Sequence, residues 1–547
     1  MTAQSRWEQR YWAWMLLTYA VVSRLGVVSV ASREPSWVHH RLDAAAYHEL
    51  AARMVAGDWL LGTEPYHLSP LYTWLVALCQ LVAGPTLWSI VTVQMALGVA
   101  TVELTRRSCA RLAGPGWGLV GGLAVAGYAP LVHSEMQLSV AAVSTFLGAA
   151  LLNRTLAWLD TSEGGTATLA TMGVLAGASV IARPNALLLL PPLLLLVGAT
   201  SWRGGGVRTA VIHSMIVVAC MVSVIAPVSL RNRWMAGESV LVTDSGGLNF
   251  YIGNGHGANG AFRVPAQVPQ AVNAFAQFEA YTDYAQAARR RELTSAEVDD
   301  YWYELAWTEI AADPGAWAAL LWTKFRLVLA DQELPNSDCF RLAVEVNPWL
   351  SLMPVRWWIL APLTLVGLAL ALVSRDLRQL VVAGWLVLMA GALVLFFVLS
   401  HYRVPLISAV AILAMLGLRG LVNGVSARRP LAVVAVATVL GLAVVLQRPV
   451  LDEPMGEEWR KYGFGWHQLG NLPRAEAAYQ RSLVLEPENI STRKNLAILL
   501  ATRGALAGAR VQWEAVLRIA RQRGLAGYEQ EAVTALQQLD RMQAPPN

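Results

Sequence analysis

Long apolar runs separated by short polar stretches fill most of the first 450 residues of the chain. A membrane-spanning helix needs about 20 mostly apolar residues, and about eleven segments meet this requirement. They are residues 11–31, 86–105, 115–132, 138–158, 167–183, 185–200, 209–228, 353–373, 379–399, 405–424 and 430–447. The pattern predicts an all-α polytopic membrane protein.

Arginines between the runs indicate the topology. With a cytoplasmic N-terminus, the inner loops collect the arginines, as the positive-inside rule requires. These are Arg106, Arg107, Arg111, Arg203, Arg208, Arg375, Arg378, Arg428 and Arg429. Residues 32–85, residues 229–352 and everything after residue 448 then lie outside. We expect a multi-pass protein of the inner (plasma) membrane whose chemistry is extracytoplasmic.

Two apolar stretches in the outer loops are too short to span. They read "PLYTWLVALCQLVAG" (residues 70–84) and "WAALLWTKFRLVLADQELP" (residues 317–335). Amphipathic segments of this kind lie in the interface plane. Both are predicted as helices along the membrane surface.

Charged residues become denser after residue 450, and the sequence there repeats with a period of 34. The matching pairs are Gly463 and Ala497, Gly470 and Gly504, Ala475 and Ala509, Tyr479 and Trp513, and Leu483 and Leu517. This pattern resembles the tetratricopeptide repeat, whose stacked helix pairs bury a shared core. We therefore predict a membrane domain at 1–450 and a periplasmic helical domain at 451–547 that binds a protein or peptide partner.

Composition agrees with this picture. The chain is 55% hydrophobic and 14% charged, with a mean hydropathy of +0.43. The net charge of +5 is explained by loop arginines, so it does not indicate nucleic acid. The four scattered cysteines form no disulfide framework or zinc spacing. No cofactor is indicated, and a divalent metal is left open. The first span is expected to stay uncleaved; a removed signal peptide is the alternative.

Asp43 begins the pattern "LDAAAYHELAARMVAG" on the outer side of the first span. Asp before a helix is a favoured N-cap, whereas a carboxylate just outside a membrane also suits a general base. The two roles are compatible, since one oxygen can cap while the other faces a substrate. The neighbouring His39, His40, Arg41 and His48 have no assigned role.

Arginines also occur within or beside predicted spans. A charge inside a span is costly and usually has a task. The arginines of this kind are Arg24, Arg183, Arg231, Arg233 and Arg403, and the last four fall at the outer face. Guanidinium groups bind phosphate through paired hydrogen bonds; the alternative is that each reaches to lipid headgroups.

The predicted outer loops contain three candidate carboxylates, Glu64, Glu135 and Glu333. A carboxylate at any of these positions can bind a sugar hydroxyl, orient an arginine or face solvent, and the spacing does not distinguish these roles. The Gly-rich "SGGLNFYIGNGHGANG" (residues 245–260) lacks the features of a nucleotide site. We predict a loop of turns lying over a site. Candidate substrate-binding residues are Tyr47, Glu64, Glu135, Asn249, Tyr251, Asn254, Glu333, His401 and Tyr402.

An ordered series of motifs covers residues 10 to about 425. It comprises "LDAAAYHELAARMVAGDWLLGTEPYHLSPLYTWLVAL", "ARPNALLLLPP", "GGLNFYIGNGHGANG" and "SHYRVPL". The series resembles bacterial members of the dolichyl-phosphate-mannose-protein mannosyltransferase superfamily, which are glycosyltransferase family 39 enzymes with the GT-C fold.

The resemblance implies transfer of a sugar from a polyprenyl-phosphate donor. Asp43 matches the family's catalytic Asp, which deprotonates the acceptor hydroxyl for an inverting attack. In place of the family's Arg-Tyr-Arg this chain has His401, Tyr402 and Arg403, so only Arg403 is carried over as a phosphate ligand. Ala44 replaces the Glu that follows the Asp in many mannosyltransferases.

The leading hypothesis is therefore a membrane glycosyltransferase with Asp43 as base and with Arg403, helped by Arg231 or Arg183, at the lipid phosphate. The acceptor is a protein or a glycolipid. A transporter or flippase of lipid-linked sugars is the first alternative, since interior arginines suit it also. A membrane scaffold bearing tetratricopeptide repeats is the second.

Overall fold

The computed structural model describes residues 3–38, 42–160, 165–271, 273–335, 338–426, 441 and 449–543. Within these ranges every regular element is a helix, apart from one isolated bridge between Tyr128 and Val355. The predicted all-α class is thus confirmed.

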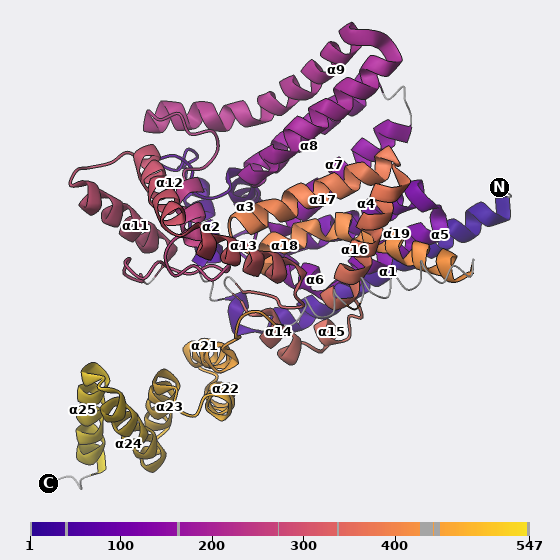
Figure 1. Ribbon diagram of the computed structural model, residues 1–547. Coiled ribbons are helices and arrows are strands. Elements are labelled where there is room, and N and C mark those ends of the chain that lie inside the picture. The colour runs from indigo at the N-terminus through magenta and orange to yellow at the C-terminus, as the bar shows by residue number, and fades with distance from the viewer. Residues whose placement is uncertain are drawn as a thin grey trace. The chain divides into compact units, whose positions relative to one another are not determined.

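The elements up to residue 236 are α1 (Ala3–Ala31), η1 (Pro35–Trp37), α2 (Leu42–Val55), α3 (Pro70–Ala83), α4 (Leu87–Ala113), α5 (Pro115–Ala126), α6 (Ala129–Glu135), α7 (Ala141–Asp160), α8 (Thr166–Ala182), η2 (Pro184–Leu189) and α9 (Leu190–Ala236). The next are α10 (Gly246–Asn254), α11 (Ala274–Arg289), α12 (Ser295–Ala312), α13 (Pro314–Leu329), α14 (Phe340–Val346), α15 (Pro348–Ser351), α16 (Trp357–Ser374), α17 (Leu377–Leu395), α18 (Ser400–Arg403), η3 (Val404–Leu406) and α19 (Ile407–Ser426). The last are α21 (Met455–Gln468), α22 (Leu472–Leu485), α23 (Ile490–Thr502), α24 (Leu506–Arg523) and α25 (Ala526–Gln543). Figure 1 carries these labels.

Seven helical stretches among the described residues are long and apolar enough to cross a membrane. They are Trp7–Ala31, Leu87–Ala113, Ala141–Asp160, Pro184–Ala236, Trp357–Ser374, Leu377–Leu395 and Ser400–Gly424. The polytopic prediction therefore holds, with fewer spans of full length than expected.

The number of full-length spans is lower than the predicted eleven for identifiable reasons. The predicted spans at 185–200 and 209–228 both lie in the stretch formed by η2 and α9, and α9 is kinked at Gly206, where φ is 76°. The predicted span at 115–132 is instead two helices, because the chain breaks at Gly127 and Pro130 follows in the first turn of α6. The span at 167–183 corresponds to α8, which has 17 residues, and the one at 430–447 falls outside the described ranges.

Close backbone approach holds the membrane helices together. A Cβ at Gly367 of α16 or Gly417 of α19 would collide with a carbonyl oxygen of the facing helix. Small residues permit such contact, which replaces the hydrophobic driving force that is absent between helices in lipid. α4 packs against α5 and α7, and α19 packs against α16 and α5.

The chain divides into two compact units. One contains residues up to Ala31 and His40–Val450, and the other contains Leu451–Asn547 together with Ser32–His39. The boundary near residue 450 agrees with the change in composition. The inclusion of Ser32–His39 in the second unit had no counterpart in the sequence pattern.

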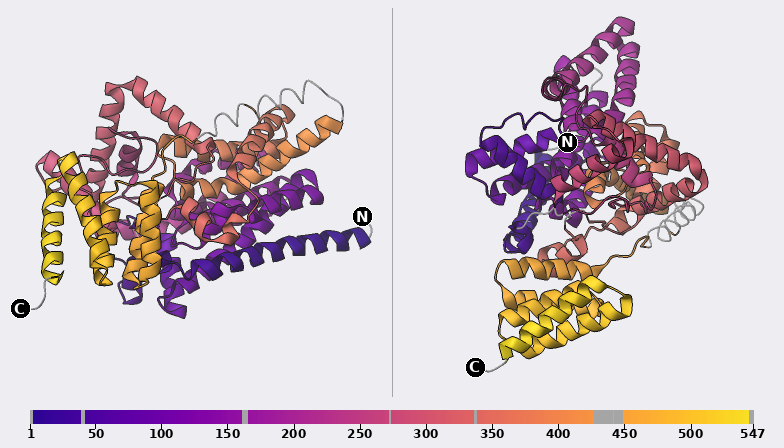
Figure 2. Two further views of the ribbon diagram at one scale, coloured as in Figure 1. Left: turned by 90° about the horizontal axis from the view of Figure 1, so that it is seen from below. Right: turned by 90° about the vertical axis from the view of Figure 1, so that its left-hand side faces the viewer.

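The second unit is a row of antiparallel helices, α21 to α25, seen side by side in Figure 2. Residues 34 apart play equal roles: Gly470 and Gly504 both have φ above 70° at the turn within a pair. Ala475 and Ala509 are both fully buried. Since the period has a structural counterpart at the turn and in the core, the unit consists of repeated helix pairs.

Candidate functional site

Asp43 is partly exposed in the first turn of α2. Because α2 begins at Leu42, Asp43 lies inside the helix and is not its N-cap as predicted. A carboxylate in a first turn still benefits from the positive end of the helix dipole. Its charge acts on three neighbouring groups, those of Tyr47, Arg183 and Tyr402.

Arg183 reaches this cluster because Pro184 ends α8. The residue before a proline is driven out of the helical region, and Arg183 is extended, with φ −147° and ψ 112°. Its Nη2 donates to the carbonyl of His401 at 3.0 Å and its Nε to Ser144 Oγ at 3.3 Å. Since a guanidinium has five N–H donors, Arg183 keeps donors for an anion.

His401 and Tyr402 enter the cluster from α18. The guanidinium carbon of Arg183 lies over the Tyr402 ring, 4.4 Å from its centroid, a geometry that attracts a cation. The His401 and Tyr402 rings are 4.1 Å apart. Residues far apart in sequence therefore place a carboxylate, a guanidinium and aromatic groups together.

Tyr47 forms the inner wall of the cluster. Burial, and then the charge of Asp43, raises the pKa of Tyr47 far above its ordinary value, so the phenol stays protonated. The ring packs edge to face on Tyr72 with centroids 4.7 Å apart. Tyr72 Oη donates to Gln94 Oε1 at 2.8 Å, and Gln94 Nε2 donates to the Glu135 carbonyl at 2.8 Å. No local sequence pattern identifies Tyr72 or Gln94 as members of the cluster.

Arg403, predicted as a ligand of the lipid phosphate, is buried and paired within the protein. Its side chain is 1% exposed and forms an ion pair with Glu333 at 2.6 Å. Its Nη atoms donate to the carbonyls of Leu327, Ala330 and Gln332. Arg403 thus anchors the end of α13 to α18.

Arg231 is occupied in the same way, which also departs from the predicted phosphate role. Its guanidinium donates to the backbone carbonyls of the turn that follows α2, namely those of Leu60, Leu61, Gly62 and Glu64. It lies over the Tyr66 ring at 4.3 Å. Arg231 therefore shapes the first outer loop.

The three candidate carboxylates named from the sequence lie in different environments. Glu135 forms an ion pair with Arg24 at 2.7 Å, and both side chains are fully buried. Glu333 pairs with Arg403 and accepts from Tyr128 Oη at 3.1 Å. Glu64 is exposed. Glu135 and Glu333 therefore compensate buried arginines, the second of the roles open to them.

The Gly-rich segment is mainly helical, where turns were predicted. Residues Gly246–Asn254 form α10, whose Gly247 N–H donates to Asp299 Oδ1 at 2.5 Å. A Cβ at Gly247 or Gly253 would collide with a backbone carbonyl. The glycines therefore serve close packing.

The polar residues of α10 are engaged in holding α12, α13 and α17. Tyr251 Oη donates to Glu309 Oε1 at 3.0 Å. Asn254 Nδ2 donates to the Leu395 carbonyl, while its Oδ1 accepts from Lys324 Nζ at 2.8 Å. Asn249 is partly exposed. Tyr251 and Asn254 thus have structural partners where sequence suggested substrate contacts.

An apolar cavity lies beside Arg231. It has a volume of about 340 Å³. Its lining is largely aromatic and aliphatic, comprising Met54, Trp59, Leu60, Tyr66, Trp74, Leu78, Leu81, Pro227 and Arg231. A groove of this composition suits an apolar chain.

The loops predicted to be external meet one another. α11 packs against α2, and His67 Nδ1 lies 2.7 Å from Asp244 Oδ1, which joins the two long loops. Sequence did not identify this pair, whose members are 177 positions apart. These contacts bring the two predicted outer loops together.

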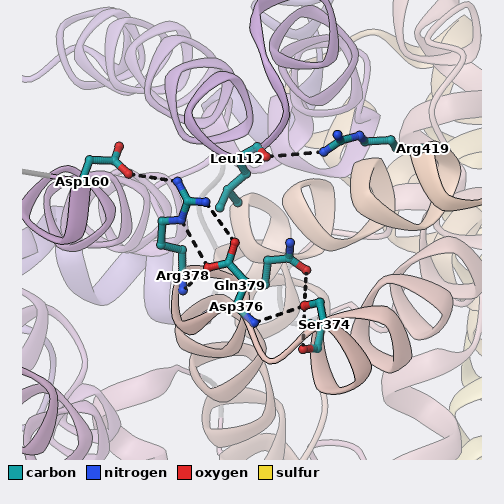
Figure 3. Close-up of polar contacts among 8 residues, drawn as sticks. Leu112, Asp160, Ser374, Asp376, Arg378, Gln379 and Arg419 are labelled. Carbon is teal, nitrogen blue, oxygen red and sulfur yellow. Dashed lines mark hydrogen bonds and ion pairs between the residues drawn. The ribbon is translucent and has the colours of Figure 1, made fainter.

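Loops predicted to be internal meet separately. Figure 3 shows Arg378 between Asp160 and Asp376, with N–O distances of 3.2 and 3.0 Å. Asp160 also pairs with Arg111 at 3.0 Å. These contacts join the ends of α4 and α7 to the start of α17. In the described part of the chain no group of three His, Cys, Asp or Glu side chains could hold a metal ion.

Fold and site thus define an all-α polytopic membrane protein with a carboxylate and a guanidinium in one cluster. No family model and no curated protein sequence matches the chain. Among solved structures it is similar to the archaeal oligosaccharyltransferase AglB from Archaeoglobus fulgidus, in complex with an inhibitory peptide and a dolichol-phosphate. The TM-score is 0.44 and the identity 11%, over 83% of this chain and 58% of AglB. The chain therefore spans little more than half of that protein.

A second similarity is to ArnT from Cupriavidus metallidurans. For ArnT bound to undecaprenyl phosphate the TM-score is 0.36 and the identity 15%, over 76% of this chain and 79% of ArnT. For ArnT in the apo state the values are 0.34 and 16%, over 75% and 78%.

Proposed function

We propose that the chain is a GT-C membrane glycosyltransferase that moves a sugar from a polyprenyl-phosphate donor to a hydroxyl acceptor on the outer face. One observation carries this proposal: Asp43 lies close enough to Arg183 and Tyr402 for its charge to act on both, and Arg183 lies over the Tyr402 ring. Proton abstraction needs a base within reach of the acceptor, and a departing phosphate needs a fixed cation. The cluster supplies both.

In the proposed reaction the acceptor oxygen attacks the anomeric carbon from the face opposite the phosphate. The acceptor proton passes to an Asp43 carboxylate oxygen. The bond between the anomeric carbon and the phosphate oxygen breaks, and its electron pair leaves with the polyprenyl phosphate. Arg183 stabilises that phosphate through charge-assisted hydrogen bonds. The sugar configuration is therefore inverted.

The cavity beside Arg231 is proposed to bind part of the isoprenoid tail, since its walls are aromatic and aliphatic. The repeated helix pairs of the second unit are proposed to be tetratricopeptide repeats that bind a protein or peptide partner. If the acceptor is a protein, it is itself the partner that the repeats bind. If the acceptor is a glycolipid, it reaches the site from the membrane.

Replacement of Asp43 tests the base. Asp43→Asn keeps the size of the side chain and removes its basicity, so transfer is expected to fall about 100-fold or more. Glycans and glycolipids of a deletion strain complemented with each variant are compared by mass spectrometry. Glu49→Gln, which alters an exposed carboxylate of the same helix, should leave the products unchanged. Wild-type product levels with Asp43→Asn would sink the assignment.

Replacement of Arg183 tests the phosphate ligand. Loss of a hydrogen bond to a charged group costs about 1.5–3 kcal/mol, so Arg183→Gln should weaken undecaprenyl phosphate binding about 10- to 100-fold. Binding is measured by titration of the purified protein in nanodiscs. Arg233→Gln serves as the control, because Arg233 is exposed. Equal weakening by both variants would contradict a specific role for Arg183.

A further inference from the structure

The hydroxyl group of Ser144 forms its hydrogen bond outside its own helix, α7. A serine or threonine inside a helix commonly donates its O–H to the carbonyl four positions earlier. Thr145 and Thr155 of α7 do so, at 2.7 and 2.8 Å. Ser144 Oγ instead accepts from Arg183 Nε at 3.3 Å, across 39 positions of the chain. Ser144 therefore differs from the other hydroxyl residues of the same helix.

The bond to Arg183 leaves the hydrogen of the Ser144 hydroxyl unused. A guanidinium group has donors only, so the serine oxygen must accept, and a hydroxyl still has one hydrogen to donate. In the described part of the chain that hydrogen has no acceptor. Ser144 is partly exposed, as are Arg183 and Tyr402. A ligand that enters the cluster can thus reach the hydroxyl.

The packing of α7 places Ser144 beside the segment that carries Tyr402. α7 packs against η3, which directly follows α18. Residues four apart lie on the same face of a helix, and Gly148 is four positions after Ser144. A Cβ at Gly148 would lie 3.1 Å from the Trp385 ring and 3.9 Å from the Pro405 carbonyl oxygen. The face of α7 that carries Ser144 is therefore turned toward α18 and η3.

Two donors from different helices thus meet at one place. Arg183 follows the end of α8 and lies over the Tyr402 ring at 4.4 Å. Ser144 lies in the first turn of α7, the positive end of the helix, which favours an anion. A phosphate group has enough acceptor oxygens to bind a guanidinium and a hydroxyl together.

We propose that Ser144 binds the phosphate of the polyprenyl-linked donor through its O–H group, beside Arg183. This rests on the proposed function and adds a second ligand to the same phosphate. A fixed donor of this kind stabilises the charge that develops on the phosphate as the sugar leaves. Ser144 is then a binding residue in its own right, besides holding Arg183.

Ser144→Ala tests the contact in the full-length protein. Only the hydroxyl is removed, and loss of a hydrogen bond to a charged group should weaken undecaprenyl phosphate binding about 10- to 100-fold. Binding is titrated with the purified protein in phosphatidylcholine nanodiscs. Thr145→Val is the matched control, because the Thr145 hydroxyl is buried and donates to the Ala141 carbonyl of its own helix. Unchanged affinity in Ser144→Ala, or an equal loss in Thr145→Val, would overturn the proposal.

A double variant separates a direct contact from an effect that passes through Arg183. If Ser144 only oriented Arg183, Ser144→Ala would add nothing once Arg183 is replaced by glutamine. A direct contact persists in that background, so the double variant should bind undecaprenyl phosphate about tenfold more weakly than Arg183→Gln alone. Equal affinities of these two variants would overturn the direct contact.

Other ligands identify the group that Ser144 recognises. Undecaprenol, which has no phosphate, should bind the wild type and Ser144→Ala equally. Inorganic phosphate and phosphatidylglycerol should not displace undecaprenyl phosphate at equal concentration, and displacement by either would overturn assignment to the donor phosphate. Failure of the proposed function is distinguishable, because Arg183→Gln would then leave the affinity unchanged. A loss with Arg183→Gln and none with Ser144→Ala would overturn the Ser144 contact alone.

Discussion

Lys324 on α13 is fully buried, and its ammonium group donates to Asn254 Oδ1. Within the described ranges no carboxylate lies within 4 Å of it. Burial lowers the pKa of Lys324 to about 7. The unfolded chain keeps a pKa near 10.5, so it binds more protons than the folded chain between these values. Stability should therefore rise as the pH increases from 7 to 10.5.

Lys324→Met removes this dependence. The variant should be more stable than the wild type at pH 7 by a few kcal/mol, at about 1.4 kcal/mol per unit of pKa shift. The difference should shrink toward pH 10. Thermal unfolding of both proteins in nanodiscs between pH 6 and 10 gives the comparison. Lys494→Met, at a partly exposed ion pair with Glu531, is the control of equal charge. A difference that does not vary with pH would contradict the prediction.

The arginines show what sequence can and cannot predict about single residues. Arg183, Arg231 and Arg403 all precede or lie in apolar helices and look alike as candidate phosphate ligands. Their roles differ because Arg231 and Arg403 meet backbone carbonyls from distant segments, whereas Arg183 meets a tyrosine ring and Asp43. Hydropathy and local motifs carry no information on such long-range partners, so the sequence indicates Asp43 and Arg183 as separate candidates and does not predict that they lie in one cluster.

At the scale of elements, the length of an apolar run predicts the presence of a helix well, but it does not predict where that helix breaks. α7, α16 and α17 lie within a few residues of the predicted spans, because an apolar run of sufficient length favours a membrane-spanning helix. The kink at Gly206 and the break at Gly127 depend on single glycines within apolar runs. Turns were predicted at α10 because glycine favours turns in a local pattern. In the folded chain these glycines make room for the backbone of distant segments, and a local pattern does not show this.

At the scale of the molecule, the charge pattern predicted which loops meet. Arg111, Asp160 and Arg378 join the predicted inner loops, and Asp43, Arg183 and Tyr402 join the predicted outer ones. Alternating topology makes this grouping necessary for any multi-span chain. It does not reveal that Ser32–His39 belongs to the second unit, since membership of a unit depends on contacts between residues far apart in the sequence.

Removal of residues 451–547 tests the proposed partner-binding task of the second unit. The membrane unit has its own buried core, so the truncated chain should retain its unfolding temperature and the proposed binding of undecaprenyl phosphate. Its turnover with a protein acceptor should fall, because the repeats proposed to bind that partner are lost. Unchanged turnover would contradict this task. Loss of phosphate binding in a folded truncation would also contradict it, since the second unit would then contribute to the donor site.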